Sequence, residues 1–156
     1  MYSPEADARA EARLRVMRIL WVAFLASVGL YALVAYLANP LSDVERARIQ
    51  GDPAPAGVPA VLVAFFALGV ALVVASFVLK QAFAKRAAAR QLPDAFQTGF
   101  ILALALCESA ALFGLVGLFV TGNRYAYALL AFGALAIALH FPRREQLLAA
   151  YFKPVG

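Results

Sequence analysis

One acidic residue, Glu108, lies inside a long apolar segment of the chain, where a carboxyl group is energetically unfavourable. The segment runs from Gly99 to Val120, and Glu108 is nine residues from its start. At about 1.5 Å per helical residue, that position would be close to the centre of a lipid bilayer. Insertion of an acid such as aspartate there costs about 2.5–3.5 kcal/mol, and intramembrane acids usually face the bundle interior. Because the charged form loses its hydration in an apolar surround, we expect a protonated carboxyl that is suited to handling protons.

Two serines are the candidate partners of this carboxyl. Ser109 follows it directly, and Ser27 holds a similar depth in the first apolar segment. The sequence thus predicts an ion-binding group of Glu108, Ser109 and Ser27, and Tyr31 is the one tyrosine deep enough to reach it. In the alternative interpretation, Glu108 is a neutral acid with one structural hydrogen bond, to Ser27 or Ser109. Such interhelical bonds average about 0.6 kcal/mol in one well-studied membrane protein. Both interpretations stay open at this point.

The remaining reactive side chains do not predict an enzyme. Cys107 is the only cysteine and lies inside an apolar segment, so neither a disulfide framework nor a thiolate metal cluster is expected. His140 is the only histidine, and its position near the end of the last apolar segment predicts that it reaches the membrane interface. The sequence has no HExxH motif, no Cys/His set and no Gly-rich phosphate loop. We therefore expect no catalytic residue, no metal site and no cofactor.

Four apolar segments must position these residues. Of the 156 residues, 64% are apolar and 15% are charged, against about 45–50% and about 25% in soluble domains. Each segment is 17 to 22 residues long, which matches the roughly 20 residues that a helix needs to cross a bilayer. We predict an all-α membrane protein, a four-transmembrane-helix bundle that forms a single membrane domain over 1–156. The predicted spans are 19–37, 58–79, 99–120 and 125–141, with tails at 1–18 and 142–156.

Basic residues concentrate on one side of the predicted spans. Eleven lie in the two tails and in the loop between the second and third spans, and three lie in the other two loops. Because lysine and arginine near span ends stay in the cytoplasm, both termini are expected there. The net charge of +5 is expected to meet anionic lipid, not nucleic acid, because the basic residues lie beside span ends. The tail segment 6–18 mixes acids and arginines, which predicts either a short helix or a solvated face.

The spans also resemble one another in pairs. The first and third align without gaps at an offset of 82, with seven identical residues, and Ser27 falls on Ser109. The second and fourth align at an offset of 67, again with seven identities, and His140 falls on Val73. Two pairs in the same order predict a tandem repeat of a two-helix hairpin, with both hairpins entering the membrane from the cytoplasm. Shared Leu/Ala composition is the alternative explanation.

The stretch of roughly residues 89–120 is similar to the proteolipid, subunit c, of rotary ATP synthases. That family has a cytoplasmic loop with Ala-Arg-Gln-Pro, followed by an outward helix with Ala-Leu-x-Glu-x-x-Ala-(Ile/Leu)-(Tyr/Phe)-Gly-Leu-Val. The matching loop residues are Ala89, Arg90, Gln91 and Pro93, and the matching helix residues are Ala105, Leu106, Glu108, Ala111, Leu112, Phe113, Gly114, Leu115 and Val116. The resemblance implies that Glu108 is the ion-carrying carboxylate, and Ser109 beside it is similar to the sodium-binding subtype. The family's first helix has glycines at alternate positions, whereas span 58–79 has only Gly69.

Two functions are therefore expected. In the first, the chain carries a proton, or sodium as the second choice, on Glu108 as a proteolipid-like subunit of a bacterial inner membrane. In the alternative, it is a non-transporting four-helix accessory or scaffold subunit, in which Glu108 only bonds to a neighbouring helix. In both cases the expected partners are membrane lipid and either further copies of the chain or other membrane subunits.

Overall fold

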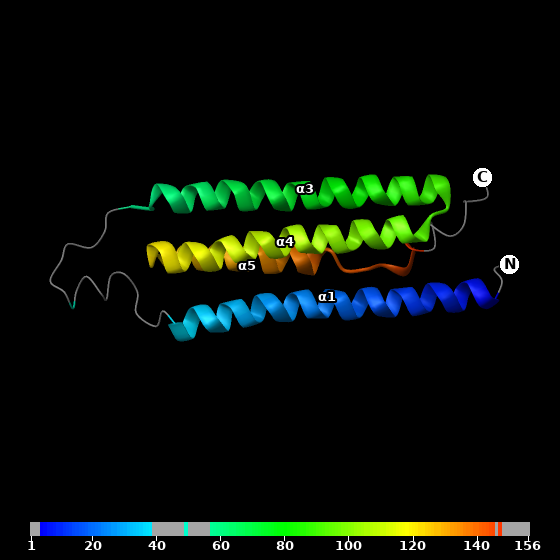
Figure 1. The fold of residues 1–156 in the computed structure, drawn as a ribbon, viewed down its shortest axis with the longest axis horizontal. Coiled ribbons are helices and arrows are strands. Elements are labelled where there is room, and N and C mark those ends of the chain that lie inside the picture. Colours follow the sequence, from blue (N-terminus) through cyan, green and yellow to red (C-terminus); the bar gives the residue numbers. More distant parts are fainter. Residues whose placement is uncertain (1–3, 39–48, 50–56, 146, 148–156) are drawn as a thin grey trace.

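The computed structural model describes residues 4–38, 49, 57–145 and 147. Within these ranges the chain is an all-α bundle, as predicted, and its helices run side by side (Figure 1). The helices are α1 (Pro4–Ala38), α3 (Ala60–Arg90), α4 (Pro93–Thr121) and α5 (Ala126–Leu139). The first three are long and apolar enough to cross a membrane, whereas α5 has 14 residues. The fold class of an all-α integral membrane bundle is thereby confirmed.

Helices α4 and α5 form the middle of the bundle, with α3 on one side and α1 on the other (Figure 1). Helix α1 runs parallel to α4, and α3 and α5 run in the opposite direction (Figure 1). Along the described residues, α1 contacts α4 and α5 but does not contact α3. The two pairs of the predicted repeat are therefore packed differently, since α4 and α5 form a contacting hairpin and α1 and α3 do not. The repeat stays a prediction from sequence alone.

The connection between α3 and α4 is much shorter than the predicted loop. Helix α3 continues through Lys80 to Arg90, so the expectation that its basic residues lie in a loop was wrong. Only Gln91 and Leu92 separate it from Pro93 at the start of α4. Gln91 closes α3 in the left-handed conformation, with φ of 51°, and Pro93 suits a first helical turn because it needs no N–H partner. The two helices form a tight hairpin.

Helix α1 begins well before its predicted span, and the tail segment 6–18 is helical. Ala10, Leu14 and Met17 recur every three or four residues, and all three are buried against the bundle. Arg13 forms an ion pair with Asp94 at the start of α4, at 2.5 Å. The helical alternative is therefore correct, and one face of this segment packs on the bundle while the other is exposed.

Two glycines bring α4 and α5 into close contact. A Cβ atom added at Gly114 would lie 2.7 Å from the backbone N of Leu130, and one added at Gly133 would lie 2.8 Å from the backbone N of Ala111. Contacts that short with backbone atoms leave no room for a side chain. The interface is thus held by small residues, which is the usual means of helix association in membranes.

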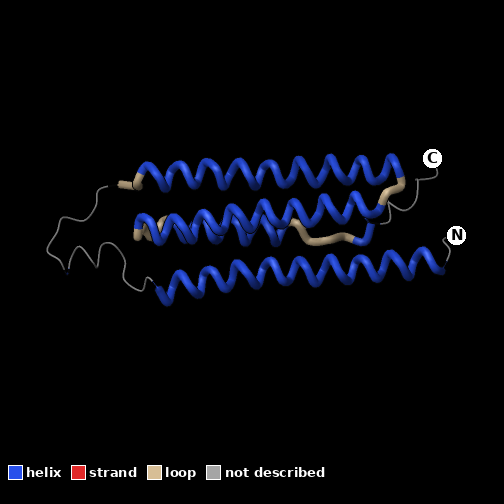
Figure 2. Tube along the Cα trace, viewed as in Figure 1, coloured by secondary structure: helices blue, strands red, loops and turns tan. Residues whose placement is uncertain are grey.

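Helix α5 ends at Leu139, two residues before the end of its predicted span, and the chain continues without helix toward the end of the bundle at which α1 begins (Figure 2). His140 and Pro142, which follow it, are both buried. Non-helical backbone is tolerated at membrane depth only where protein or a water-filled cavity surrounds it. The burial of these residues meets that condition.

Candidate functional site

The carboxyl of Glu108 on α4 meets two hydroxyl groups of α1. Ser27 Oγ lies 2.5 Å from Glu108 Oε1, and Tyr31 Oη donates to the same oxygen at 2.9 Å. Ser27 and Tyr31 are four residues apart, so one face of α1 presents both hydroxyls to α4. The structure therefore brings together Glu108 and Ser27 of the predicted group, and adds Tyr31. The carboxyl itself is half-buried.

Ser27 takes part in two short contacts. Its Oγ lies 2.8 Å from the backbone oxygen of Phe24 as well as 2.5 Å from Glu108 Oε1, so three oxygen–oxygen contacts link Tyr31, Glu108, Ser27 and Phe24. A serine hydroxyl has one proton to donate and can also accept. With an ionised carboxylate, Ser27 can donate to Glu108. With a neutral carboxylic acid, Ser27 can accept from Glu108 while it donates to Phe24.

Ser109 lies apart from this group. Its hydroxyl donates to the backbone oxygen of Ala105 at 2.8 Å, one turn earlier on α4. This local bond is common for serine within helices. An ion-binding role for Ser109 stays a prediction, and the hydrogen-bonded partner of Glu108 is Ser27.

Glu108 forms no ion pair with a basic side chain of the described residues. Among the residues that the structure describes, the ion pairs of the bundle lie near the end at which α1 begins, such as Arg13 with Asp94. The described residues also contain no group of three or more metal-binding side chains. The site is therefore a carboxyl hydrogen-bonded by hydroxyls, which accommodates a proton without a counter-charge.

A second polar cluster lies behind Glu108, on the opposite side of α4. The thiol of Cys107 donates to Ser76 Oγ on α3 at 3.3 Å, and Ser76 Oγ lies 3.4 Å from Nε2 of His140. His140 is fully buried and its ring packs on Phe77, with ring centroids 4.3 Å apart. The expectation that His140 reaches the membrane interface was therefore wrong. The signal that could have indicated this is Pro142, which follows closely and cannot continue a helix.

His140 closes the end of α5 with its own side chain. Its Nδ1 lies 2.7 Å from the backbone oxygen of Ala136, and because that oxygen only accepts, we assign the proton to Nδ1. The indole of Trp21 donates to the next carbonyl, that of Ile137, at 2.8 Å. The Ile137 carbonyl also accepts the backbone N–H of His140 at 3.0 Å, so side chains add to the backbone bonds that close this helix end.

Comparisons of the chain with protein-family models, curated proteins and solved structures give no match. Functional inference therefore depends on the residues themselves. Of the two polar clusters, the one around His140 is enclosed, and its bonds join α3, α4 and the end of α5. The cluster around Glu108 is half-buried and contains a carboxyl group.

Proposed function

We propose that this protein is a small integral membrane subunit that takes up and releases one proton at Glu108, in the manner of the ATP synthase proteolipids that residues 89–120 resemble. The observation that carries this proposal is the bonding of Glu108, whose carboxyl contacts the hydroxyls of Ser27 and Tyr31 and forms no described ion pair. This arrangement accommodates the carboxyl with or without its proton, because Ser27 can accept a hydrogen bond from the acid or donate one to the carboxylate. The protein is then a non-catalytic component of a membrane complex.

The hairpin of α3 and α4 supports the same proposal. The residues that resemble the proteolipid loop, from Ala89 to Pro93, form the tight turn between the two helices. Glu108 lies 15 residues after Pro93, on the second helix of the hairpin, which is where the resemblance implies the ion-carrying acid. With the basic end of the bundle in the cytoplasm of a bacterial cell, this turn faces a cytoplasmic partner.

Access to the carboxyl requires an exposed side, and Glu108 is not fully enclosed. Helix α1 bonds to it through Ser27 and Tyr31, and many apolar residues of α1 are exposed on the isolated chain, including Ile19, Leu30 and Leu33. We propose that lipid and either further copies of this chain or other membrane subunits cover this surface. Proton exchange would then occur where Glu108 meets such a partner.

The second candidate function is that of a non-transporting scaffold subunit. It is favoured by the fact that both hydroxyl partners of Glu108 come from α1, so the same bonds fasten α1 to α4. In a scaffold the proton on Glu108 never leaves. The two candidates therefore differ in whether Glu108 exchanges its proton in the native membrane.

Carbodiimide labelling separates the two functions. Dicyclohexylcarbodiimide reacts with a protonated carboxyl in an apolar site, and the adduct is located by peptide mass spectrometry on protein in its native membrane. A proton carrier is expected to be labelled at Glu108 to an extent that falls reversibly as the pH is raised, with sodium slowing the reaction if sodium also binds. Glu108→Gln removes the labelling, and the matched control Ser109→Ala, whose hydroxyl bonds to Ala105, retains it.

Labelling that does not change with pH supports the scaffold function, if the Glu108→Gln variant also assembles into its membrane complex as the wild type does. Absence of labelling in the native membrane contradicts proton carriage at Glu108. The mass of the purified complex is a second readout, because a ring of many copies is proteolipid behaviour, whereas a monomer or a dimer is not.

A further inference from the structure

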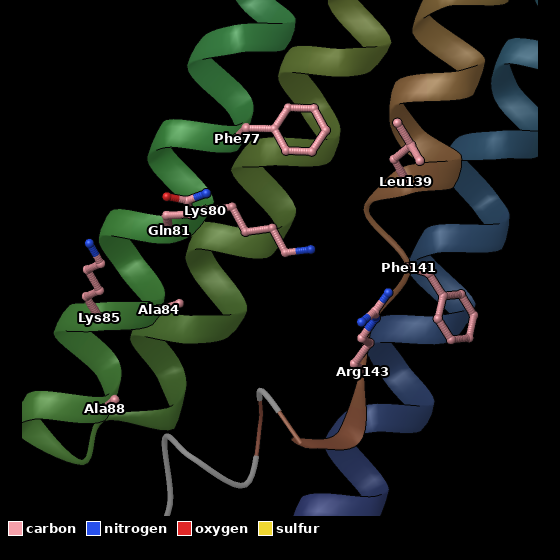
Figure 3. A pocket seen from close by; sticks show the side chains of 9 residues that line it. All are labelled: Phe77, Lys80, Gln81, Ala84, Lys85, Ala88, Leu139, Phe141 and Arg143. Atoms are coloured by element: carbon pink, nitrogen blue, oxygen red, sulfur yellow. The ribbon is translucent and has the colours of Figure 1, made fainter.

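A cleft of about 540 Å³ opens between α3 and the segment that follows α5. One part of its lining is apolar and includes Phe77, Leu139 and Phe141. Three basic side chains, Lys80, Lys85 and Arg143, lie on the other part. Figure 3 shows that two of them, Lys80 from α3 and Arg143 from the segment after α5, extend toward one another at the mouth. The cleft thus combines an apolar wall with a positively charged mouth.

The cleft results from the early end of α5. Helix α3 continues for ten residues beyond Lys80, whereas α5 stops at Leu139 and gives way to non-helical chain. A full-length fourth helix would pack along this half of α3. In its absence, apolar side chains line both sides of the cleft, including Phe77 on α3 and Leu139 at the end of α5.

Neither cation at the mouth has an acidic partner. Among the described residues, no ion pair involves Lys80 or Arg143, and the recorded contact of the Lys80 ammonium is with the ring of Phe100, at 5.9 Å. Two cations that face one cleft repel one another, and an anion between them removes that repulsion. The mouth of the cleft is therefore complementary to an anionic group.

The depth of Lys80 suits a lipid headgroup. It lies 20 residues after Ala60 on α3, and at about 1.5 Å per residue this distance equals the roughly 30 Å thickness of the hydrocarbon core. If Ala60 lies at one boundary of that core, Lys80 lies at the other. The apolar wall of the cleft, with Phe77 one turn deeper, then lies at the level of the acyl chains.

We propose that this cleft binds one anionic phospholipid, with its phosphate between Lys80 and Arg143 and an acyl chain along Phe77 and Leu139. Basic pockets between membrane helices on the cytoplasmic side are known to hold acidic headgroups. A free phosphate ion would satisfy the two cations but would leave the apolar wall uncovered. The phospholipid satisfies both parts. This site does not involve Glu108, so the lipid-binding proposal is independent of proton carriage.

Native mass spectrometry of the full-length chain tests the proposal. The protein is purified from nanodiscs of phosphatidylglycerol and phosphatidylcholine in equal amounts, and the lipid that stays bound is identified. One phosphatidylglycerol per chain is expected. The double variant Lys80→Ala/Arg143→Ala is expected to prefer phosphatidylglycerol roughly 30-fold less than the wild type does. This factor corresponds to the attraction that two basic side chains contribute near an anionic membrane surface.

The control variant Arg86→Ala/Arg90→Ala removes the same charge from the same end of α3, at exposed positions that do not line the cleft. It is expected to keep the preference. Equal retention of the two lipids, or equal loss in both double variants, overturns the proposal. Displacement of the bound lipid by millimolar inorganic phosphate also overturns it, because the cleft is then a site for the phosphate group alone. Circular dichroism of each variant checks that the bundle is folded.

Discussion

The phenolic hydroxyl of Tyr31 and the carboxyl of Glu108 meet across the boundary between α1 and α4, 2.9 Å apart. This bond and that of Ser27 are the polar connections of α1 to the middle of the membrane-spanning part of α4. The same boundary also contains the ion pair of Arg13 with Asp94, at the end where α1 begins. The packing of α1 on α4 therefore depends in part on Glu108, and this dependence can be measured as a coupling energy.

A double-mutant cycle of Tyr31→Phe and Glu108→Leu is expected to show a coupling energy of about 0.6 kcal/mol, and at most about 1.7 kcal/mol, as for other interhelical hydrogen bonds in membranes. The measurement is unfolding by sodium dodecyl sulfate in mixed micelles. Tyr36→Phe is the matched control, since Tyr36 is exposed and has no described bond to Glu108. A coupling of zero would show that the Tyr31 bond does not hold α1 in solution.

Substitution of Gly133 by alanine is expected to destabilise the bundle by about 1–3 kcal/mol, because the new Cβ atom would meet the backbone of Ala111 at 2.8 Å. Gly29→Ala is the control for helix propensity. Its Cβ atom would meet nothing within 4 Å, and it is expected to stabilise α1 by up to about 1 kcal/mol. The same detergent titration reports both variants. Effects of equal sign would contradict close packing at Gly133.

Replacement of His140 by alanine is expected to lower the free energy of unfolding by about 1–3 kcal/mol, since it leaves the Ala136 carbonyl without its side-chain donor. Ser76→Ala is expected to have a smaller effect, because the Ser76 hydroxyl donates chiefly to Val73 of its own helix, at 2.6 Å. Unfolding titrations rank the two variants. A larger loss for Ser76→Ala would show that the serine, and not the histidine, organises this cluster.

Reversing the charge of Arg13 or of Asp94 alone is expected to lower the free energy of unfolding. Exchanging the two charges is expected to restore only part of that loss. Both side chains are at least partly exposed, so the pair contributes no more than about 1 kcal/mol. Asp94 also lies in the first turn of α4, where a negative charge interacts favourably with the helix dipole by about 0.3–1 kcal/mol. The swapped protein is therefore expected to stay below wild type in stability. Full recovery would indicate that the pair alone matters.

The approximate positions of the long apolar helices could be predicted, because they follow from the lengths of the apolar segments in the sequence. The reach of Tyr31 to Glu108 followed from counting residues along the helices, whereas the depth of Glu108 in a membrane stays a prediction. Which helices pack together could not be predicted, since hydropathy is equal on all sides of these segments. The segment between α1 and α3 spans 21 residues, from Asn39 to Pro59, which is long enough for α3 to pack against the far side of α4.

Two predictions are wrong for local reasons. The basic residues from Lys80 to Arg90 end the apolar run, which predicts a loop, but alanine-rich sequence between them continues α3. The apolar run extends to Phe141, which predicts that His140 lies at the interface. The helix stops before that residue, and hydropathy does not record where a helix stops within an apolar run. Burial of an isolated histidine depends on partners from other helices, which a single segment does not reveal.

The 14 residues of α5 have a consequence for how the protein is made. A helix of that length spans about 21 Å, which is too short to insert into the bilayer stably on its own. The two-residue turn joins α3 directly to α4, so we expect these two helices to insert together. We expect α5 to integrate only when the Gly114 surface of α4 is present for it to pack against. Among the described helices, α5 would then be the last to be integrated.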